Sequence, residues 1–98
     1  MVLTILEAVV APDRVADLQA AYRNAAAETP PGLIRSYLIV AADEPTRYRI
    51  ETLWSSRDAL LAMRQAGTPA GVLMFRAAGA EPTLSIYNVT ATIEAPPG

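Results

Sequence analysis

The chain has 98 residues, of which 52% are hydrophobic, a length and composition typical of one globular domain with a packed core. Ten acidic and eight basic residues give a net charge of −2 with no run of like charge, so the sequence shows no sign of a nucleic-acid-binding surface. It contains neither cysteine nor histidine, which excludes disulfides, thiolate nucleophiles, imidazole bases and the usual nitrogen and sulfur ligands for zinc, iron or copper.

The N-terminal segment Val2 to Val10 is rich in β-branched and aliphatic residues, which predicts a first strand. It is too short to span a membrane and lacks the basic region and cleavage site of a signal peptide, so we expect a cytoplasmic protein without membrane contact. From Pro12 to about Glu28, apolar residues recur at every third or fourth position. This spacing predicts a helix with one buried face, which the sequence Pro30-Pro31-Gly32 ends.

The middle of the chain predicts a hairpin followed by a helix. Two strand-like runs, Leu33 to Ala41 and Arg47 to Trp54, are separated by a turn-rich stretch of five residues at 42–46, so the strands should pair antiparallel. The segment Ser55-Ser56-Arg57-Asp58 resembles a capping box in which Ser55 is the cap. It predicts a short helix that continues to about Ala66.

The last third of the chain predicts another short helix and a final strand. The helix should run from about Pro69 to Ala78, with Thr68 as its cap and Gly79 just past its end. The strand should run from Thr83 to about Ile93. Residues 94–98 are expected to form a flexible tail beyond one domain of residues 1–93.

The resulting order β-α-β-β-α-β is that of the ferredoxin-like α+β fold, an antiparallel sheet with its helices on one face. The other face should be polar if it met water. Several strands are instead apolar on both faces, and in the first strand Val2, Leu6, Ala8 and Val10 alternate with Leu3, Ile5 and Val9. We therefore expect a homodimer in which a second copy covers the helix-free face. The alternative, scattered surface aliphatics, explains less well why three strands share the pattern.

The third strand differs because only one of its faces is apolar. Its alternation places Tyr48 and Trp54 under the helices and Arg49 and Glu51 on the face of the expected interface, where they could pair with Glu7 and set the register.

The segment Leu53 to Leu60, with a tryptophan at a strand end, a short polar cap and a helix start, resembles the antibiotic biosynthesis monooxygenase-like family of the dimeric α+β barrel superfamily. Pro31-Gly32 before the second strand and Asp43-Glu44-Pro45 in the hairpin also fit this family. The resemblance covers nearly the whole chain by order of elements. It implies a dimeric α+β barrel, and among activities it implies either cofactor-free oxygenation of polycyclic aromatic phenols, haem degradation, or chemistry of another kind.

In catalytic members of that family, a pocket between sheet and helices is lined by a first-strand asparagine, the tryptophan and, in haem degraders, a histidine. The tryptophan matches Trp54, whereas the asparagine would fall at about Leu6 and the histidine at about Met63. Both positions are apolar here. The resemblance therefore disfavours haem degradation, and we expect neither a metal nor another cofactor.

If the chain has such a pocket, we expect its lining to include aromatic and methionine side chains, namely Tyr22, Tyr48, Trp54, Met63 and Phe75. This lining suits a flat aromatic ligand, and Arg76 near the mouth could stabilise a phenolate or enolate, so Trp54 and Arg76 are the candidate catalytic residues. The alternative is that the aromatic and methionine side chains on the helices are simply core residues.

Two functions thus remain open at this point. The first is a monooxygenase-like protein that oxygenates a small aromatic or polyketide-type substrate without a cofactor. The second is a non-oxidative protein of the same superfamily, either cyclase-like or a small-ligand-binding or stress-associated dimer without catalysis. A purely structural pairing module would require that no cavity exist.

Overall fold

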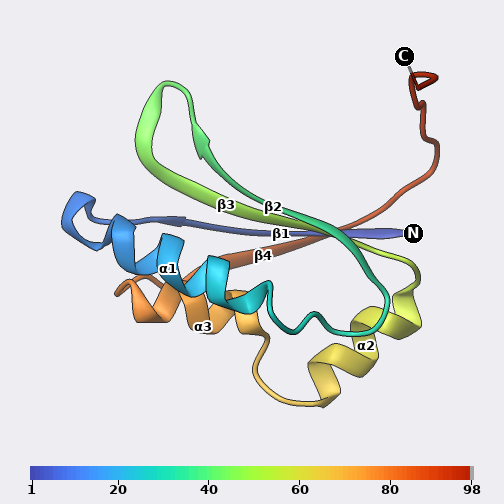
Figure 1. Ribbon diagram of the computed structural model, residues 1–98, viewed down its shortest axis with the longest axis horizontal. Helices are drawn as coiled ribbons and strands as arrows, with labels where there is room; N and C mark the ends of the chain where they lie inside the picture. Colours follow the sequence, from blue (N-terminus) through green and yellow to red (C-terminus); the bar gives the residue numbers. More distant parts are fainter. Residues whose placement is uncertain (98) are drawn as a thin grey trace.

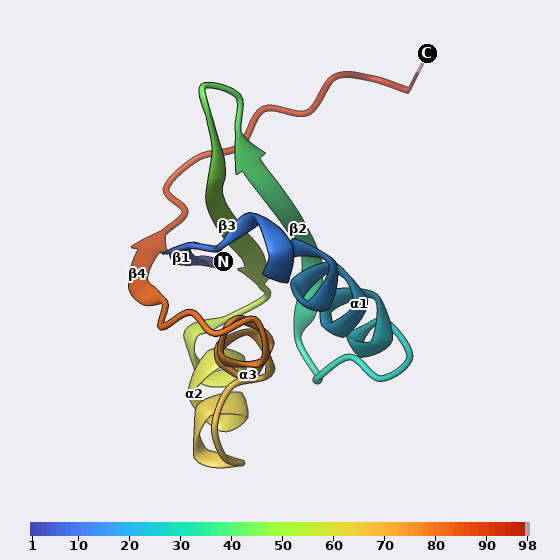
Figure 2. The ribbon, with the colours of Figure 1, turned by 90° about the vertical axis from the view of Figure 1, so that its left-hand side faces the viewer.

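The apolar N-terminal segment forms a central strand of an antiparallel sheet in the computed structural model, which describes residues 1–97. The elements follow in the order β1 (Val2–Val9), α1 (Val15–Ala25), β2 (Leu33–Ala41), β3 (Glu44–Trp54), α2 (Arg57–Gln65), α3 (Ala70–Ala77) and β4 (Thr83–Asn88). The strand order is β2-β3-β1-β4, and the helices lie together on one face of the sheet (Figures 1 and 2). The predicted ferredoxin-like arrangement is confirmed.

The two faces of the sheet differ in burial. In β1 the residues at even positions are buried under the helices, whereas Leu3, Ile5 and Glu7 on the other face are half-buried. The predicted alternation of β3 is also confirmed, since Tyr48, Ile50, Thr52 and Trp54 are all buried on the helix side. We refer to the opposite side, which carries residues 3, 5, 7 and 9 of β1, as the open face.

The hairpin between β2 and β3 is tighter than predicted. Ala41 pairs with Glu44, so β3 begins three residues earlier than expected and only Ala42 and Asp43 form the turn. An irregularity near the start of β2 shifts its register between Leu33 and Arg35, which brings Leu33 opposite Trp54. This shift places Leu33 against Trp54 on the helix side.

The first helix begins and ends differently from the prediction. Pro12–Arg14 form a short 3-10 helix, and α1 continues from Val15 only to Ala25, three residues short of Glu28. The residues after Ala25 form turns whose backbone amides bond to carbonyls three residues earlier, because the chain is already bending toward β2.

The caps of α2 and α3 are corrected by the structure. Ser56, not Ser55, caps α2, and its Oγ accepts a hydrogen bond of 3.1 Å from the backbone N–H of Ala59. The Ser55 N–H instead donates to the Gly32 carbonyl at 2.8 Å, so Ser55 still belongs to the end of the sheet. Pro69 occupies the N-cap position of α3, and Thr68 does not cap it. Gly79 follows α3 with a φ of +73°, as its predicted position past a helix end requires.

The last strand is shorter than predicted because its partner ends. Asn88 already pairs with Val2, the first residue of β1, and beyond it the Val89 N–H still donates to the Met1 carbonyl at 3.0 Å. The segment after Val89 leaves the sheet (Figure 1), and Ile93, the predicted strand end, is 101% exposed. Gly98, the last residue of the expected tail, lies outside the described residues.

The core between sheet and helices has two parts. The larger cluster joins β1 and β3 to α1 and α3 around the fully buried Leu18 and Phe75. The smaller cluster packs Val2, Trp54 and Leu60 together where α2 meets the sheet, with Leu33 and Met63 against it. No helix within residues 1–97 is long and apolar enough to cross a membrane.

Candidate functional site

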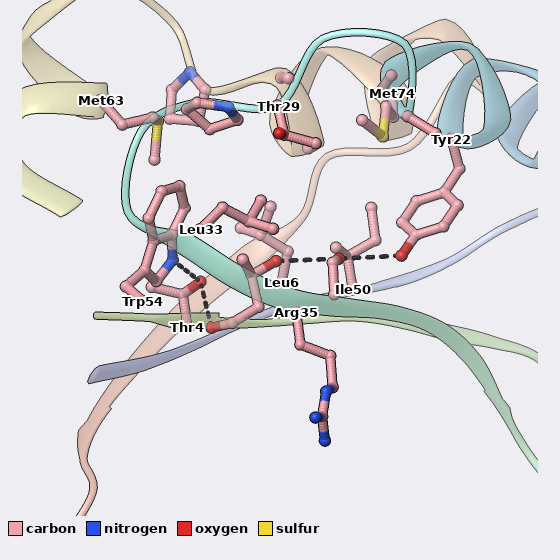
Figure 3. Close-up of a pocket in the computed structure, with 18 of the residues that line it drawn as sticks. Thr4, Leu6, Tyr22, Thr29, Leu33, Arg35, Ile50, Trp54, Met63 and Met74 are labelled. Carbon is pink, nitrogen blue, oxygen red and sulfur yellow. Dashed lines mark hydrogen bonds between the residues drawn. The ribbon is translucent and has the colours of Figure 1, made fainter. Parts of the chain in front are cut away.

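A cavity of about 400 Å³ lies between the helix side of the sheet and the helices, next to Trp54 (Figure 3). Strands β1, β2 and β3 form its floor, the end of α1 and the following loop form one wall, and α2 and the first turns of α3 close the other. Its lining includes Thr4, Leu6, Tyr22, Ser36, Thr52, Trp54, Met63 and Met74.

A row of hydroxyl groups crosses the floor of this otherwise apolar cavity. The Tyr22 hydroxyl donates to Ser36 Oγ at 3.0 Å, and Ser36 Oγ lies 3.2 Å from Thr52 Oγ1 (Figure 3). The sheet register explains the row, because Ser36 and Thr4 are both direct neighbours of Thr52 on adjacent strands. The polar positions of three strands therefore meet in one place.

Trp54 is held in orientation by the same row. Its Nε1–H donates to Thr4 Oγ1 at 3.1 Å, and the Thr4 hydroxyl in turn donates to the Thr52 carbonyl at 3.4 Å. The indole is only 4% exposed, so this bond satisfies a donor that has little access to water. Throughout residues 1–97, every fully buried side-chain nitrogen or oxygen has a hydrogen-bond partner.

Two apolar residues line the cavity at the positions where the resemblance to known proteins implies polar ones. Leu6 projects from β1, and Met63 projects from α2 near Trp54. The first turn of α3 packs closely on Leu6, since a side chain at Gly71 would place its Cβ 2.7 Å from Leu6 Cδ1. The glycine thus permits a close approach that sets the width of the cavity.

Of the residues expected to line a pocket, Tyr22, Trp54 and Met63 lie in the cavity wall. Tyr48 and Phe75 belong instead to the larger core cluster, and Phe75 is 0% exposed. Sequence reasoning missed Thr4, Ser36 and Thr52. Their signal is a hydroxyl residue at a strand position whose neighbours two residues away are apolar, but only the register shows that the three lie side by side.

Arg76 lies away from this cavity. It lines a second cavity of about 360 Å³, together with residues of α2 and β4, and forms a two-bond ion pair with Glu81 at 3.0 and 2.9 Å. The hydrogen bonds and charge of Glu81 raise the pKa of Arg76, and those of Arg76 lower the pKa of Glu81. Both groups are therefore ionised at neutral pH, and the structure does not bring Arg76 together with Trp54 in one cavity lining.

The first cavity can hold a flat ring and bond to one of its oxygens. Trp54 and Met63 offer a large polarisable surface, and the hydroxyls of Tyr22 and Ser36 can donate or accept. Its two charged lining residues, Glu28 and Arg35, are exposed, and Arg35 extends away from the cavity across the sheet (Figure 3). The described lining thus offers neutral hydrogen-bonding groups in its interior and charges only at its margin.

Comparisons with known proteins give a family and a fold. The family model described as "antibiotic biosynthesis monooxygenase" matches residues 1–68 of the chain. No curated protein matches.

Among solved structures, a candidate antibiotic biosynthesis monooxygenase from Deinococcus radiodurans is 13% identical, covers 99% of this chain and 100% of its own, and superposes with a TM-score of 0.75. SnoaB of Streptomyces nogalater, a cofactor-independent oxygenase, is 18% identical with a TM-score of 0.71, and the match covers 96% of this chain and 97% of SnoaB. A variant of MhuD with two manganese protoporphyrin IX molecules per active site is 18% identical with a TM-score of 0.74, over 97% of this chain and 100% of that one. At these identities the structural likeness shows a shared fold.

Proposed function

Because this chain belongs to the antibiotic biosynthesis monooxygenase family, we propose that the cavity next to Trp54 binds a small aromatic or polyketide-type molecule and promotes its oxygenation by dioxygen without a cofactor. The observation that carries the proposal is the row of hydroxyl groups on the floor of an apolar cavity of about 400 Å³. Pockets of this size and polarity are typical of small-molecule sites in which a few polar groups fix the orientation of a ligand.

In this proposal the ring of the ligand stacks near Trp54, and its phenolic or keto oxygen faces Tyr22 and Ser36. The Tyr22 hydroxyl already donates to Ser36 Oγ at 3.0 Å, so a small rotation redirects that proton to a ligand oxygen. Oriented hydroxyl donors in an apolar cavity favour the enolate or phenolate form of the ligand over the neutral form. The chain would thereby raise the population of the form that reacts with dioxygen.

The substrate supplies the electrons in this reaction. An anthrone-type ligand loses one proton of its ring CH₂ group to solvent, and the resulting anion forms a carbon–oxygen bond with dioxygen. The remaining proton of that carbon is then lost as the O–O bond of the peroxide breaks and hydroxide departs. The CH₂ group becomes a carbonyl, one oxygen atom leaves as water, and dioxygen is the oxidant. The residues of the cavity bind, orient and stabilise the anion, and no redox group of the protein takes part.

The proposal is tested by following oxygen uptake with anthrone as substrate. Replacing Tyr22 by Phe removes one hydroxyl donor and keeps the ring, and loss of an oriented donor at a developing anion should lower the rate by about tenfold or more. The matched control is Tyr87→Phe, the same change at an exposed tyrosine of β4 outside the cavity. Equal rates in the two variants, or no oxygen uptake by the parent protein, would contradict the oxygenase proposal.

One observation favours a second candidate, a protein that binds such molecules without oxidising them. Leu6 and Met63 fill the positions at which the family resemblance implies an asparagine and a histidine. A cavity without these polar groups could still hold an aromatic ligand. Binding of anthrone, measured by quenching of the single tryptophan, without oxygen uptake would support this candidate.

We further propose that the open face of the sheet is covered by a second copy of the chain. Four large apolar side chains are exposed there, namely Val9, Tyr37, Ile39 and Tyr87. In their midst Arg49 Nε donates to Glu7 Oε1 at 2.6 Å, and this hydrogen bond lowers the pKa of Glu7 and raises that of Arg49. Contiguous exposed apolar surface marks interaction sites, and two sheets pack face to face through such surfaces.

A further inference from the structure

The second cavity adjoins the first and shares part of its wall. Four residues line both, namely Thr4 and Leu6 of β1, Met63 of α2 and Pro69 before α3. The first cavity extends from this shared wall toward α1 and β2. The second extends toward β4, whose residue Leu84 is part of its lining. Figure 2 shows the corresponding arrangement, with α2 and α3 between the side of the molecule that carries α1 and the side that carries β4.

The two cavities differ in charge. Two arginines, Arg64 and Arg76, and the hydroxyl residue Thr68 line the second cavity, and no acidic residue belongs to its described lining. Leu60 and Val72 supply apolar surface beside them. An apolar cavity with guanidinium groups at its edge is complementary to the acidic end of an otherwise apolar molecule.

The two arginines are not equally available. Arg76 is held by Glu81 through two hydrogen bonds, so its charge is already largely compensated. Arg64, in the last turn of α2, forms no ion pair with any carboxylate of residues 1–97. Arg64 is therefore the cation that remains to meet an anion from outside the chain.

We propose that the second cavity receives the carboxylate of an aromatic acid whose ring lies in the first cavity, and that Arg64 recognises this carboxylate. The inference rests on the proposed binding function of the first cavity, and it specifies in addition that the ligand carries a negative charge. Met63 lines both spaces, and its flexible thioether side chain can move to let one ligand occupy both. Leu6 and Thr4 then form a continuous floor beneath the ligand.

The test compares two probes of nearly the same shape, anthraquinone-2-carboxylate and its neutral analogue 2-(hydroxymethyl)anthraquinone, by calorimetry at low salt. We expect the parent protein to bind the carboxylate about fivefold more tightly than the alcohol, the size of effect that one partly exposed ion pair supplies. Arg64→Gln should remove this preference, so that the variant binds the two probes with equal affinity. The matched control is Arg57→Gln, which removes the same charge from the same helix at a position that lines neither cavity.

A second variant should strengthen binding, which a folding defect cannot imitate. Glu81→Gln frees Arg76 from its carboxylate partner, so the preference for the anionic probe should grow by about a further threefold to fivefold. Equal affinities for the two probes in the parent protein would overturn the inference and leave the proposed function standing. An equal loss in Arg57→Gln and Arg64→Gln would overturn it as well, because only net charge would then matter. If neither probe binds, the proposed function fails together with this inference.

Discussion

Three hydroxyl residues from different strands determine the shape and chemistry of the cavity floor. Thr4, Ser36 and Thr52 stand side by side because of the strand register, and they connect the Trp54 indole at one end with the Tyr22 hydroxyl at the other. Threonine and serine in a buried strand face would ordinarily weaken a core unless each hydroxyl found a partner. Here each hydroxyl has a partner, since Ser36 and Thr52 bond to each other and Thr4 bonds to the Trp54 indole and the Thr52 carbonyl. The row is therefore stable and still able to bond to a ligand.

The bond between Thr4 and Trp54 can be tested by stability. Thr4→Val keeps the shape of the side chain but leaves the buried Trp54 N–H without its partner, and we expect a loss of about 1–3 kcal/mol in the free energy of unfolding by urea. Thr4→Ser keeps the hydroxyl and should cost clearly less. In a Trp54→Phe background the Thr4→Val loss should shrink, since no indole N–H is left unpaired. An unchanged loss in that background would show that Thr4 acts through packing alone.

Sequence reasoning reached some of the cavity residues and not others for identifiable reasons. Trp54 and Met63 lie at the end of a strand and on the inner face of the next helix, so local pattern and family resemblance together place them in the wall. Phe75 and Tyr48 satisfy the same apolar pattern, yet they fall where α1 and α3 close on the sheet and leave no space. Whether such an apolar side chain lines a cavity or fills the core depends on how closely the helices pack on the sheet, which the local sequence pattern does not determine.

At the scale of elements, the connection between β3 and α2 joins the sheet to the wall of the site. Gly32 adopts a φ of +85°, and its carbonyl accepts from the Ser55 N–H, so the end of β3 is tied to the start of β2. A side chain at Gly32 would place its Cβ within van der Waals overlap of Ala59 in α2. This close approach positions α2, and therefore Met63, over the end of the sheet.

The cap of α2 gives a prediction at this scale. Ser56→Ala removes the oxygen that accepts from the Ala59 N–H, and it should lower the free energy of unfolding by about 1 kcal/mol. Ser55→Ala is the matched control, since Ser55 provides no cap, and we expect a change within about 0.5 kcal/mol. Urea unfolding followed by circular dichroism measures both. A larger loss in Ser55→Ala than in Ser56→Ala would contradict the observed cap.

At the scale of the whole molecule, the sheet is asymmetric because its three helices cover only one side. The open face carries exposed aromatic and aliphatic residues, and the pair of Glu7 and Arg49 lies among them. Water contact with that much apolar surface is unfavourable, whereas a second sheet would bury it. The open face is therefore suited to the proposed pairing of two copies of the chain.

The proposed pairing is tested by replacing, one at a time, two large side chains of nearly equal exposure, one on the open face and one on a helix. Tyr37 on the open face is 53% exposed, and Leu73 on the outer side of α3 is 52% exposed. Tyr37→Lys should weaken self-association by about tenfold or more, because a charge buried in an interface between two sheets loses its water. Leu73→Lys should leave self-association unchanged. Sedimentation velocity over a range of concentrations makes the comparison, and a monomeric parent protein or an unaffected Tyr37→Lys variant would refute the pairing.

The sequence by itself determined the order of the elements, the buried faces of β1 and β3 and the ferredoxin-like fold, because periodicity and helix-ending residues act over a few neighbouring positions. Only the tertiary structure decided what lies together across long stretches of chain. Thr4 and Thr52 are 48 residues apart, and their contact depends on the register between β1 and β3. The same holds for Arg76, which the packing of α2 and α3 assigns to the second cavity, and for β4, whose length is set by where its partner β1 begins.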